Sequence, residues 1–156
     1  MVGGKEAVFN RVKPLFECLG KTIVHMGGQG AGQITKACNQ LALLVTAQGT
    51  AEALSLANSC GVDPAKVRAV MMGGVASSRV LELFGKRMVE RNFAAGIETR
   101  LYHKDLHIVL DLAHELGVAT PAAALTMQHI NALMGRGEGR SDLSALIKVV
   151  EEASKR

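Results

Sequence analysis

The chain has 156 residues and a formal net charge of +4; 48% of its residues are hydrophobic and only 3% are aromatic. A chain of this length forms one domain, or one domain and a fragment of another, and can bury a core. The scarcity of aromatic residues favours a mostly helical protein over a β-sandwich. Lys and Arg are scattered, so the basic stripe of a nucleic-acid binder is not expected, and an acidic small molecule is the better partner.

The cysteines and the apolar segments indicate a cytoplasmic protein. Cys18, Cys38 and Cys60 are odd in number, show no CxxC spacing and lie in apolar contexts, so they are expected to be reduced core residues. No signal peptide is recognisable. The longest apolar segment carries polar residues such as Lys36 and Glu52, so it is not expected to span a membrane.

The first residues predict one helix and one strand. Residues 5–19 form an amphipathic pattern that ends at Gly20, and residues 21–26, KTIVHM, form a short β-branched run. A single strand needs a partner for its backbone groups. The MVGG start has no element of its own and reads as the end of a segment that begins upstream. Residues 1–28 are therefore expected to be the remnant of a sheet domain whose other strands are absent.

One long helix is expected at the centre of residues 29–156. From Gln33 to Cys60 no proline intervenes, and apolar residues cover most of the helical circumference. A helix that is apolar nearly all round is a buried one. The remaining helices follow in order: residues 65–72 after an Asp63-Pro64 start, a helix capped by Ser77 or Ser78 that ends near Arg91, residues 98–116, residues 121–134 after Thr120, and a last helix capped by Ser141. The GRGEGR segment, residues 135–140, is predicted to be a mobile linker.

The glycine-rich turn GGQGAG precedes the long helix, but it does not fit a dinucleotide-binding loop. Counted from Gly28 and Gly30, the third glycine position of GxGxxG holds Gln33. No acidic residue follows at the distance that a ribose contact requires. The glycines are better explained by a tight turn and close helix packing.

Lys36 and Asn39 form the sharpest candidate site. Three residues apart, they share one face of the long helix, with Gln40 beside them. Lys36 lies in the first turns, where the helix dipole disfavours a further positive charge, and this favours proton transfer by its amine. A solvated lysine at a helix end is the alternative that the spacing leaves open.

Two other polar groups carry weaker signals. Lys104-Asp105 reads as a charged helix start, in which a buried Asp105 would need a partner. His103, His107, Asp111 and His114 recur at helical spacing and imitate a metal site, but a solvated polar stripe explains them better, so no metal is expected.

The sequence resembles the C-terminal domain of the β-hydroxyacid dehydrogenases, a family that includes 3-hydroxyisobutyrate dehydrogenase. GGQGAGQITKACN, residues 27–39, matches the substrate-side motif GGxGxGxxxKxxN. Further segments agree in the same order: AEAL at 51–54, GGVASSRVLELFGKRM at 73–88, F…G…KDL at 93–106, GVATP at 117–121 and SALIK at 144–148. The resemblance covers essentially the whole chain, and GGVASS is most similar to the tartronate semialdehyde (2-hydroxy-3-oxopropionate) reductase branch.

This resemblance implies a fold and a set of roles. The fold would be all-α, a helical C-terminal dehydrogenase domain (residues 29–156) that also dimerises, built round the long helix and preceded by a remnant helix and strand of a Rossmann domain (residues 1–28). Lys36 would be the catalytic proton donor and acceptor, Asn39 with Gln40 would bind substrate, and Lys104 would reach the cofactor. The cofactor would be NAD or NADP, held mainly by a Rossmann half that lies before Met1.

The resemblance also implies an activity, hydride transfer between a nicotinamide and a small aldehyde-acid or hydroxyacid. The isolated chain is expected to be inactive and to form a homodimer or a higher homo-oligomer. The alternative is a non-catalytic helical dimerisation module from a truncated dehydrogenase gene, which would retain the same residues. A helical nucleic-acid binder is a third alternative, and its binding would fall steeply with salt.

Overall fold

The computed structural model describes residues 1–154, and this part of the chain is mostly helical, as the composition predicted. It divides into two compact units, residues 1–40 and residues from 41 onward. The division falls inside the long helix α2, Ala31–Ser59, and not at residue 28. A division by contacts does not define domains, so the boundary after residue 28 stays a prediction.

Residues 1–40 contain two strands and not one. β1 (Val2–Gly3) and β2 (His25–Gly27) pair in parallel, with α1 (Glu6–Glu17) connecting them. The prediction of a single unpaired strand and of an opening without structure is therefore wrong. A two-residue strand leaves no readable pattern, because its pairing comes from a segment about twenty residues away in the sequence.

Close backbone approach explains the glycines around the start of α2. A Cβ on Gly32 would lie 3.1 Å from both Gly3 N and Met1 O, and a Cβ on Gly3 would lie 2.7 Å from Gly28 O. Gly27 and Gly30 have φ values of 116° and 86°, which L side chains rarely adopt. The structural interpretation of the glycine motif therefore agrees with the backbone.

Helix α2 matches the predicted Gln33–Cys60 closely, but it is not buried all round. Its buried residues include Leu44, Ala47 and Leu54, whereas Ile34 and Leu56 are 53% and 66% exposed. The apolar residues around a helix show which positions can be buried. The elements that pack against the helix decide which of these positions are buried. For the same reason the expectation of core cysteines is wrong, since all three are free and exposed.

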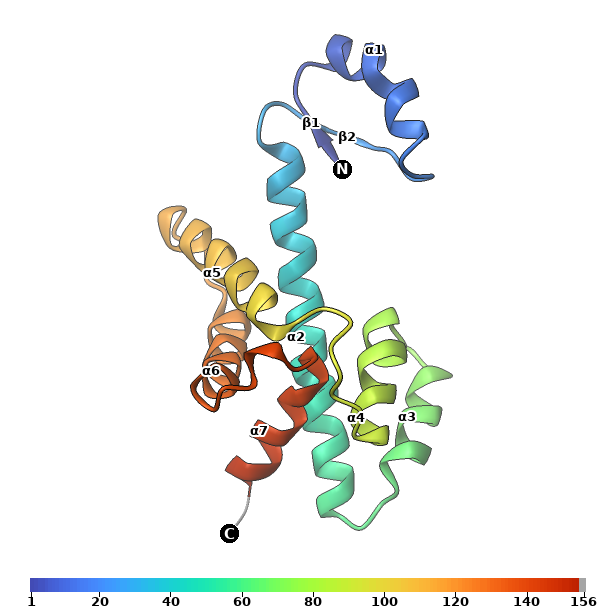
Figure 1. Cartoon of the computed structure of the whole chain (residues 1–156), viewed down its shortest axis with the longest axis vertical. Helices are drawn as coiled ribbons and strands as arrows, with labels where there is room; N and C mark the ends of the chain where they lie inside the picture. Colours follow the sequence, from blue (N-terminus) through green and yellow to red (C-terminus); the bar gives the residue numbers. More distant parts are fainter. Residues whose placement is uncertain (155–156) are drawn as a thin grey trace. The chain divides into compact units, whose positions relative to one another are not determined.

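The helices that follow α2 in the sequence pack around it within the second unit. In Figure 1, α3 and α4 lie on one side of α2, and α5 and α6 lie on the other. Their bounds are Pro64–Met72 for α3, a π-helical turn at Leu81–Gly85 that continues as α4 (Lys86–Glu90), Thr99–Glu115 for α5, Pro121–Gly135 for α6, 3-10 turns at Glu138–Arg140 and Leu143–Ala145, and Leu146–Ala153 for α7.

Two predicted helix starts agree with the structure. Asp63 caps α3, since its Oδ1 accepts from Ala65 N at 2.8 Å, and Pro64 occupies the first turn. Ser78 begins the next helix, because its Oγ accepts from Leu81 N at 2.9 Å. At α6 the proline is in place, but Thr120 makes no capping hydrogen bond with its side chain.

The segment before α7 differs from its prediction. Residues 138–140 form a 3-10 turn and not a mobile linker, and Glu138 pairs with Lys148 of α7 at 2.6 Å. The cap is Asp142 and not Ser141: its Oδ1 accepts from the backbone N of Ser144 at 3.0 Å. The Glu138–Lys148 ion pair joins two different elements. Rules based on local sequence patterns therefore do not reveal it.

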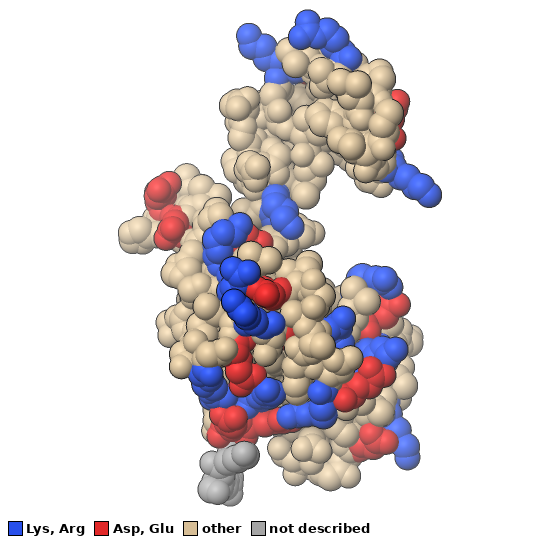
Figure 2. All heavy atoms as spheres, in the orientation of Figure 1, with Lys and Arg blue, Asp and Glu red and all other residues tan. Residues whose placement is uncertain are grey.

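Charges of both signs are mixed on the surface of the second unit. On the face shown in Figure 2, Lys and Arg lie among Asp and Glu. Ion pairs of this unit include Arg79–Glu82 and Arg91–Glu151. Such mixing agrees with the scattered basic residues of the sequence. Among the helices of residues 1–154, none combines the length and apolarity that crossing a bilayer requires.

Candidate active site

Lys36, Asn39 and Gln40 meet at one atom. Lys36 Nζ donates a hydrogen bond to Gln40 Oε1 at 2.8 Å, and Asn39 Nδ2 donates to the same oxygen at 3.2 Å. The i,i+4 geometry of α2 brings the lysine and the glutamine together, because residues four apart face the same side of a helix. Lys36 and Asn39 are exposed, whereas Gln40 is only 5% exposed. The cluster therefore presents an ammonium and an amide to solvent over a buried acceptor.

A pocket of about 470 Å³ lies beside this cluster, within residues 1–40. Lys36 and Phe16 line it together with Val2 and Gly3 of β1, Gly30 immediately before α2 and Gly32 in its first turn. The first backbone N–H groups of a helix attract anions. The pocket thus combines a cationic side chain with the positive end of a helix dipole, which attracts an anion such as a carboxylate, although the N–H groups of Ala31 and Gln33 already donate to Gly28 O and Gly30 O.

Lys104 lies in the second unit, on α5, next to its ion-pair partner. Lys104 Nζ is 2.8 Å from Asp105 Oδ1, and the lysine side chain is 65% exposed. Asp105 is only partly buried, with its side chain 22% exposed, and it has Lys104 as an ion-pair partner. Burial raises the pKa of the neighbouring Tyr102, and the carboxylates of Asp142 and Asp105 raise it further. An exposed ammonium of this kind remains accessible to an anionic ligand.

Two histidines of the stripe on α5, His103 and His107, make contacts between side chains. The Nε2 atom of His103 lies 2.8 Å from Asn131 Oδ1 of α6, and its ring meets His107 edge-on, with the centroids 4.6 Å apart. Within residues 1–154, no group of three or more His, Cys, Asp or Glu side chains is placed to hold a metal ion.

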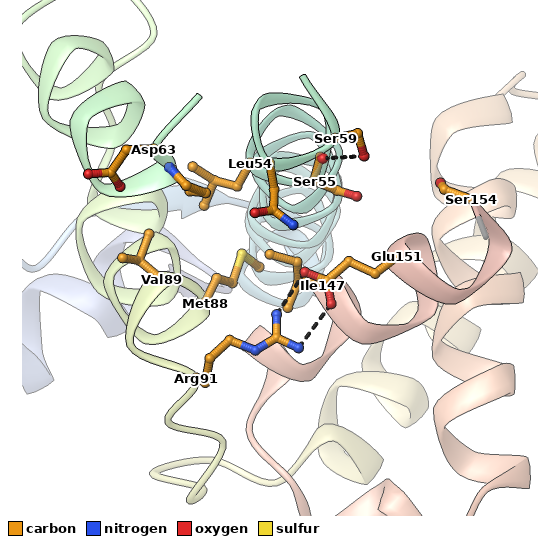
Figure 3. Close-up of a pocket in the computed structure, with 12 residues that line it drawn as sticks. Leu54, Ser55, Ser59, Asp63, Met88, Val89, Arg91, Ile147, Glu151 and Ser154 are labelled. Atoms are coloured by element: carbon orange, nitrogen blue, oxygen red, sulfur yellow. Dashed lines mark hydrogen bonds and ion pairs between the residues drawn. The ribbon is translucent and has the colours of Figure 1, made fainter. Parts of the chain in front are cut away.

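A larger pocket, about 620 Å³, lies in the second unit between α2, α3, α4 and α7. Figure 3 shows Leu54, Met88 and Ile147 at its wall. Arg91 and Glu151 form a two-point ion pair there, with distances of 2.8 and 2.9 Å. These charged groups neutralise each other, and none of the predicted site residues lines this pocket.

Sequence reasoning placed Lys36, Asn39 and Gln40 together, but it did not identify two features of the site. One is the role of Gln40 as the shared acceptor, which the i,i+4 spacing from Lys36 could have indicated. The other is the pocket wall that Val2 and Gly3 supply, for which the sequence carries no signal.

Comparison with known proteins identifies relatives along nearly the whole chain. Residues 30–150 match a family model described as "NAD-binding of NADP-dependent 3-hydroxyisobutyrate dehydrogenase". The chain is 44% identical over 151 residues to the 2-hydroxy-3-oxopropionate reductase of Escherichia coli, covering 97% of this chain and 52% of the relative. It is 36% identical over 132 residues to the 3-hydroxyisobutyrate dehydrogenase of Pseudomonas aeruginosa, covering 80% of this chain and 44% of the relative.

Solved structures agree with these relatives. The 3-hydroxyisobutyrate dehydrogenase of Salmonella typhimurium superposes with a TM-score of 0.88 at 27% identity, covering 94% of this chain and 52% of that one. The Mycobacterium tuberculosis enzyme of the same name, solved with L-serine, gives 0.87 at 27% identity and covers 96% and 54%. The chain thus spans about half the length of the curated relatives and solved structures that it matches.

Proposed function

This chain belongs to the 3-hydroxyisobutyrate dehydrogenase family, and we propose that it is the lysine-bearing half of an NAD(P)-dependent dehydrogenase for small hydroxyacids. Its identity with the Escherichia coli enzyme supports tartronate semialdehyde reduction as the reaction. The observation that carries the proposal is the position of the Lys36 ammonium, which is hydrogen-bonded to Gln40 and lines a pocket of about 470 Å³.

Lys36 acts as the proton donor during reduction. As the substrate's aldehyde carbon accepts a hydride, its oxygen gains negative charge, and the ammonium of Lys36 gives that oxygen a proton. In the reverse direction the neutral amine removes the proton from the hydroxyl group. Such general acid–base catalysis contributes on the order of a hundredfold to ten-thousandfold in rate.

The substrate's carboxylate is bound at the start of α2. Gly30 and Gly32 line the pocket. The N–H groups of Ala31 and Gln33 already donate to the backbone oxygens of Gly28 and Gly30, so the attraction comes from the positive end of the helix dipole and from the Lys36 ammonium. Asn39, whose amide lies on the Lys36 side of α2, binds the substrate's polar oxygens. These contacts place the carbonyl within reach of Lys36.

Lys104 contributes the contact with the cofactor. NAD or NADP supplies or accepts the hydride, and its pyrophosphate is anionic. The ammonium of Lys104 is 65% exposed, so a phosphate oxygen can reach it without breaking into a core. Most of the cofactor contacts come from a Rossmann half, because this chain's glycine turn lacks the third glycine of GxGxxG.

The test joins this chain to the N-terminal half of the Escherichia coli relative and measures tartronate semialdehyde reduction with NADH and NADPH. Lys36→Ala is expected to lower kcat by about a hundredfold or more, while the KM of the nicotinamide stays within about twofold of its original value. Lys66→Ala, at an exposed lysine of α3, is the matched control and should leave kcat unchanged.

Two results would contradict the proposal. Near-normal turnover of Lys36→Ala would remove Lys36 from the mechanism. A folded chimera without any activity towards small hydroxyacids or aldehyde-acids would favour the non-catalytic dimerisation module.

A further inference from the structure

Gln40 differs from its two neighbours in burial and in bonding. Its side chain is 5% exposed, and its single carbonyl oxygen accepts from both Lys36 Nζ and Asn39 Nδ2. A carbonyl oxygen has two lone pairs, so two donors satisfy it. A substrate atom seeking Gln40 Oε1 would have to displace one of these donors inside a buried site.

We propose that Gln40 is a positioning residue, which holds the Lys36 amine in its working place and acts on the substrate only through that amine. This inference rests on the proposed role of Lys36 in proton transfer. It replaces the direct substrate contact that the sequence suggested for Gln40 with an indirect one.

A lysine needs such a support because its side chain is long and flexible. An exposed ammonium on four methylene groups samples many rotamers, and fixing it costs conformational entropy at each turnover. When the acceptor is itself buried and restrained, the lysine side chain loses this conformational entropy once, during folding, and not at each turnover. The proton then starts from a defined point, as effective catalysis requires.

The neutral charge of Gln40 matters as much as its place. Lys36 alternates between ammonium and amine in the proposed cycle, and both forms have N–H groups that can donate to an amide oxygen. A carboxylate at 2.8 Å would favour the ammonium strongly. Glutamine therefore holds the lysine in both states, whereas glutamate would retain its proton.

The first test measures lysine motion in the 156-residue chain itself, without cofactor or substrate. NMR relaxation of ¹⁵N-labelled lysine side chains reports how restricted each ammonium group is, and Lys36→Arg assigns the Lys36 signal. In the wild type, Lys36 is expected to be more restricted than exposed Lys66. In Gln40→Leu it should become as mobile as Lys66, while Gln40→Glu should keep it restricted.

Gln48→Leu is the matched control for this test. Gln48 lies on the same helix, is 4% exposed and donates to Glu52 at 2.7 Å, four residues further on. It therefore loses the same kind of buried amide with the same helical spacing. Lys36 should stay restricted in this variant, which separates a direct effect of Gln40 from general loosening of α2.

The second test uses the active chimera. Gln40→Leu is expected to lower kcat by about tenfold, the scale of a hydrogen bond to a charged group, with the substrate KM within about twofold. In Gln40→Glu, hydroxyacid oxidation should require a pH about one unit higher, because the new carboxylate retains the proton on Lys36. A purely structural role for Gln40 would not move the pH profile.

The outcomes distinguish this inference from the proposed function. Unchanged Lys36 mobility in Gln40→Leu would overturn the positioning role, and so would a raised substrate KM with unchanged kcat, which would make Gln40 a substrate ligand. An active Lys36→Ala chimera would instead overturn the proposed function. In that case the NMR result would still show whether Gln40 holds the lysine.

Discussion

At the scale of single residues, Gly3 and Gly32 show how little room the start of α2 leaves. A Cβ added to Gly3 would lie 2.7 Å from a backbone oxygen, that of Gly28. A Cβ added to Gly32 would lie 3.1 Å from its nearest backbone atoms. Backbone cannot move aside as a side chain can, so Gly3→Ala should destabilise the residue 1–40 unit by about 1–3 kcal/mol. Gly32→Ala should cost less, because its contacts are longer.

Gly28→Ala is the control for both variants, since a Cβ there meets nothing within 4 Å. Denaturant unfolding of the three variants, followed by a probe in residues 1–40, would measure the difference. Equal stability of Gly3→Ala and Gly28→Ala would show that β1 does not approach α2 as described.

Lys104 allows cofactor binding to be separated from stability. In its ion pair with Asp105, the Lys104 side chain is 65% exposed and the Asp105 side chain 22%, and ion pairs at the surface contribute only about 0–1 kcal/mol. In the active chimera, Lys104→Ala should therefore raise the KM of the nicotinamide severalfold with almost no change in Tm.

Lys86→Ala removes a similarly exposed pair, with Glu90 at 3.8 Å, and should change neither quantity. A lowered Tm for Lys104→Ala with an unchanged cofactor KM would make the Lys104–Asp105 pair structural and leave the cofactor without this contact.

At the scale of secondary-structure elements, Asp142 joins three segments of the second unit. The carboxylate is 3% exposed; it caps the turn before α7 through Ser144 and lies 3.3 Å from Arg87 of α4. The backbone N–H of Asp142 also donates to Phe93 O at 2.9 Å in the loop before α5. One residue thus connects α4 and the turn before α7 through its side chain, and the loop before α5 through its backbone N–H.

Asp142→Ala is expected to lower the free energy of unfolding by about 2–4 kcal/mol, because it removes the cap and leaves buried donors without their acceptor. Thermal unfolding of the chain would measure the loss. Glu90→Ala, at an exposed residue of the same region, should cost less than about 0.5 kcal/mol. A similarly small loss for Asp142→Ala would mean that the carboxylate contributes little, and that apolar packing and backbone hydrogen bonds such as Asp142 N to Phe93 O hold the three segments together.

At the scale of the whole molecule, exposed apolar side chains lead us to expect self-association. Leu101 and Ile108, one heptad apart on α5, are 45% and 53% exposed, and Leu56 of α2 is 66% exposed. Burying exposed apolar surface of this kind against a second protein surface is favourable. Light scattering over a concentration series should show a dimer or a larger oligomer, and a monomer at high concentration would contradict this.

The same sample should show no turnover with NADH or NADPH, since no stretch of the sequence contains the strand–GxGxxG–helix unit.

The proximity of Lys36, Asn39 and Gln40 was predictable because it is local, whereas their roles stay a prediction. Lys36, Asn39 and Gln40 occupy neighbouring positions of one helix, and the helical repeat determines that side chains four residues apart meet. The same reasoning predicted the Asp63 cap and the extent of α2, because both depend on residues close in the sequence.

The sequence by itself therefore determined most of the helices, the proximity of Lys36 to Asn39 and Gln40, and the glycines that the turn before α2 requires. Only the tertiary structure decided the parallel pairing of Val2–Gly3 with His25–Gly27, the burial of Asp142 and the exposure of the cysteines. Each of these depends on which distant residues come into contact. Local propensity and periodicity describe a segment's own backbone and faces, but the free energy of pairing and burial belongs to two segments at once.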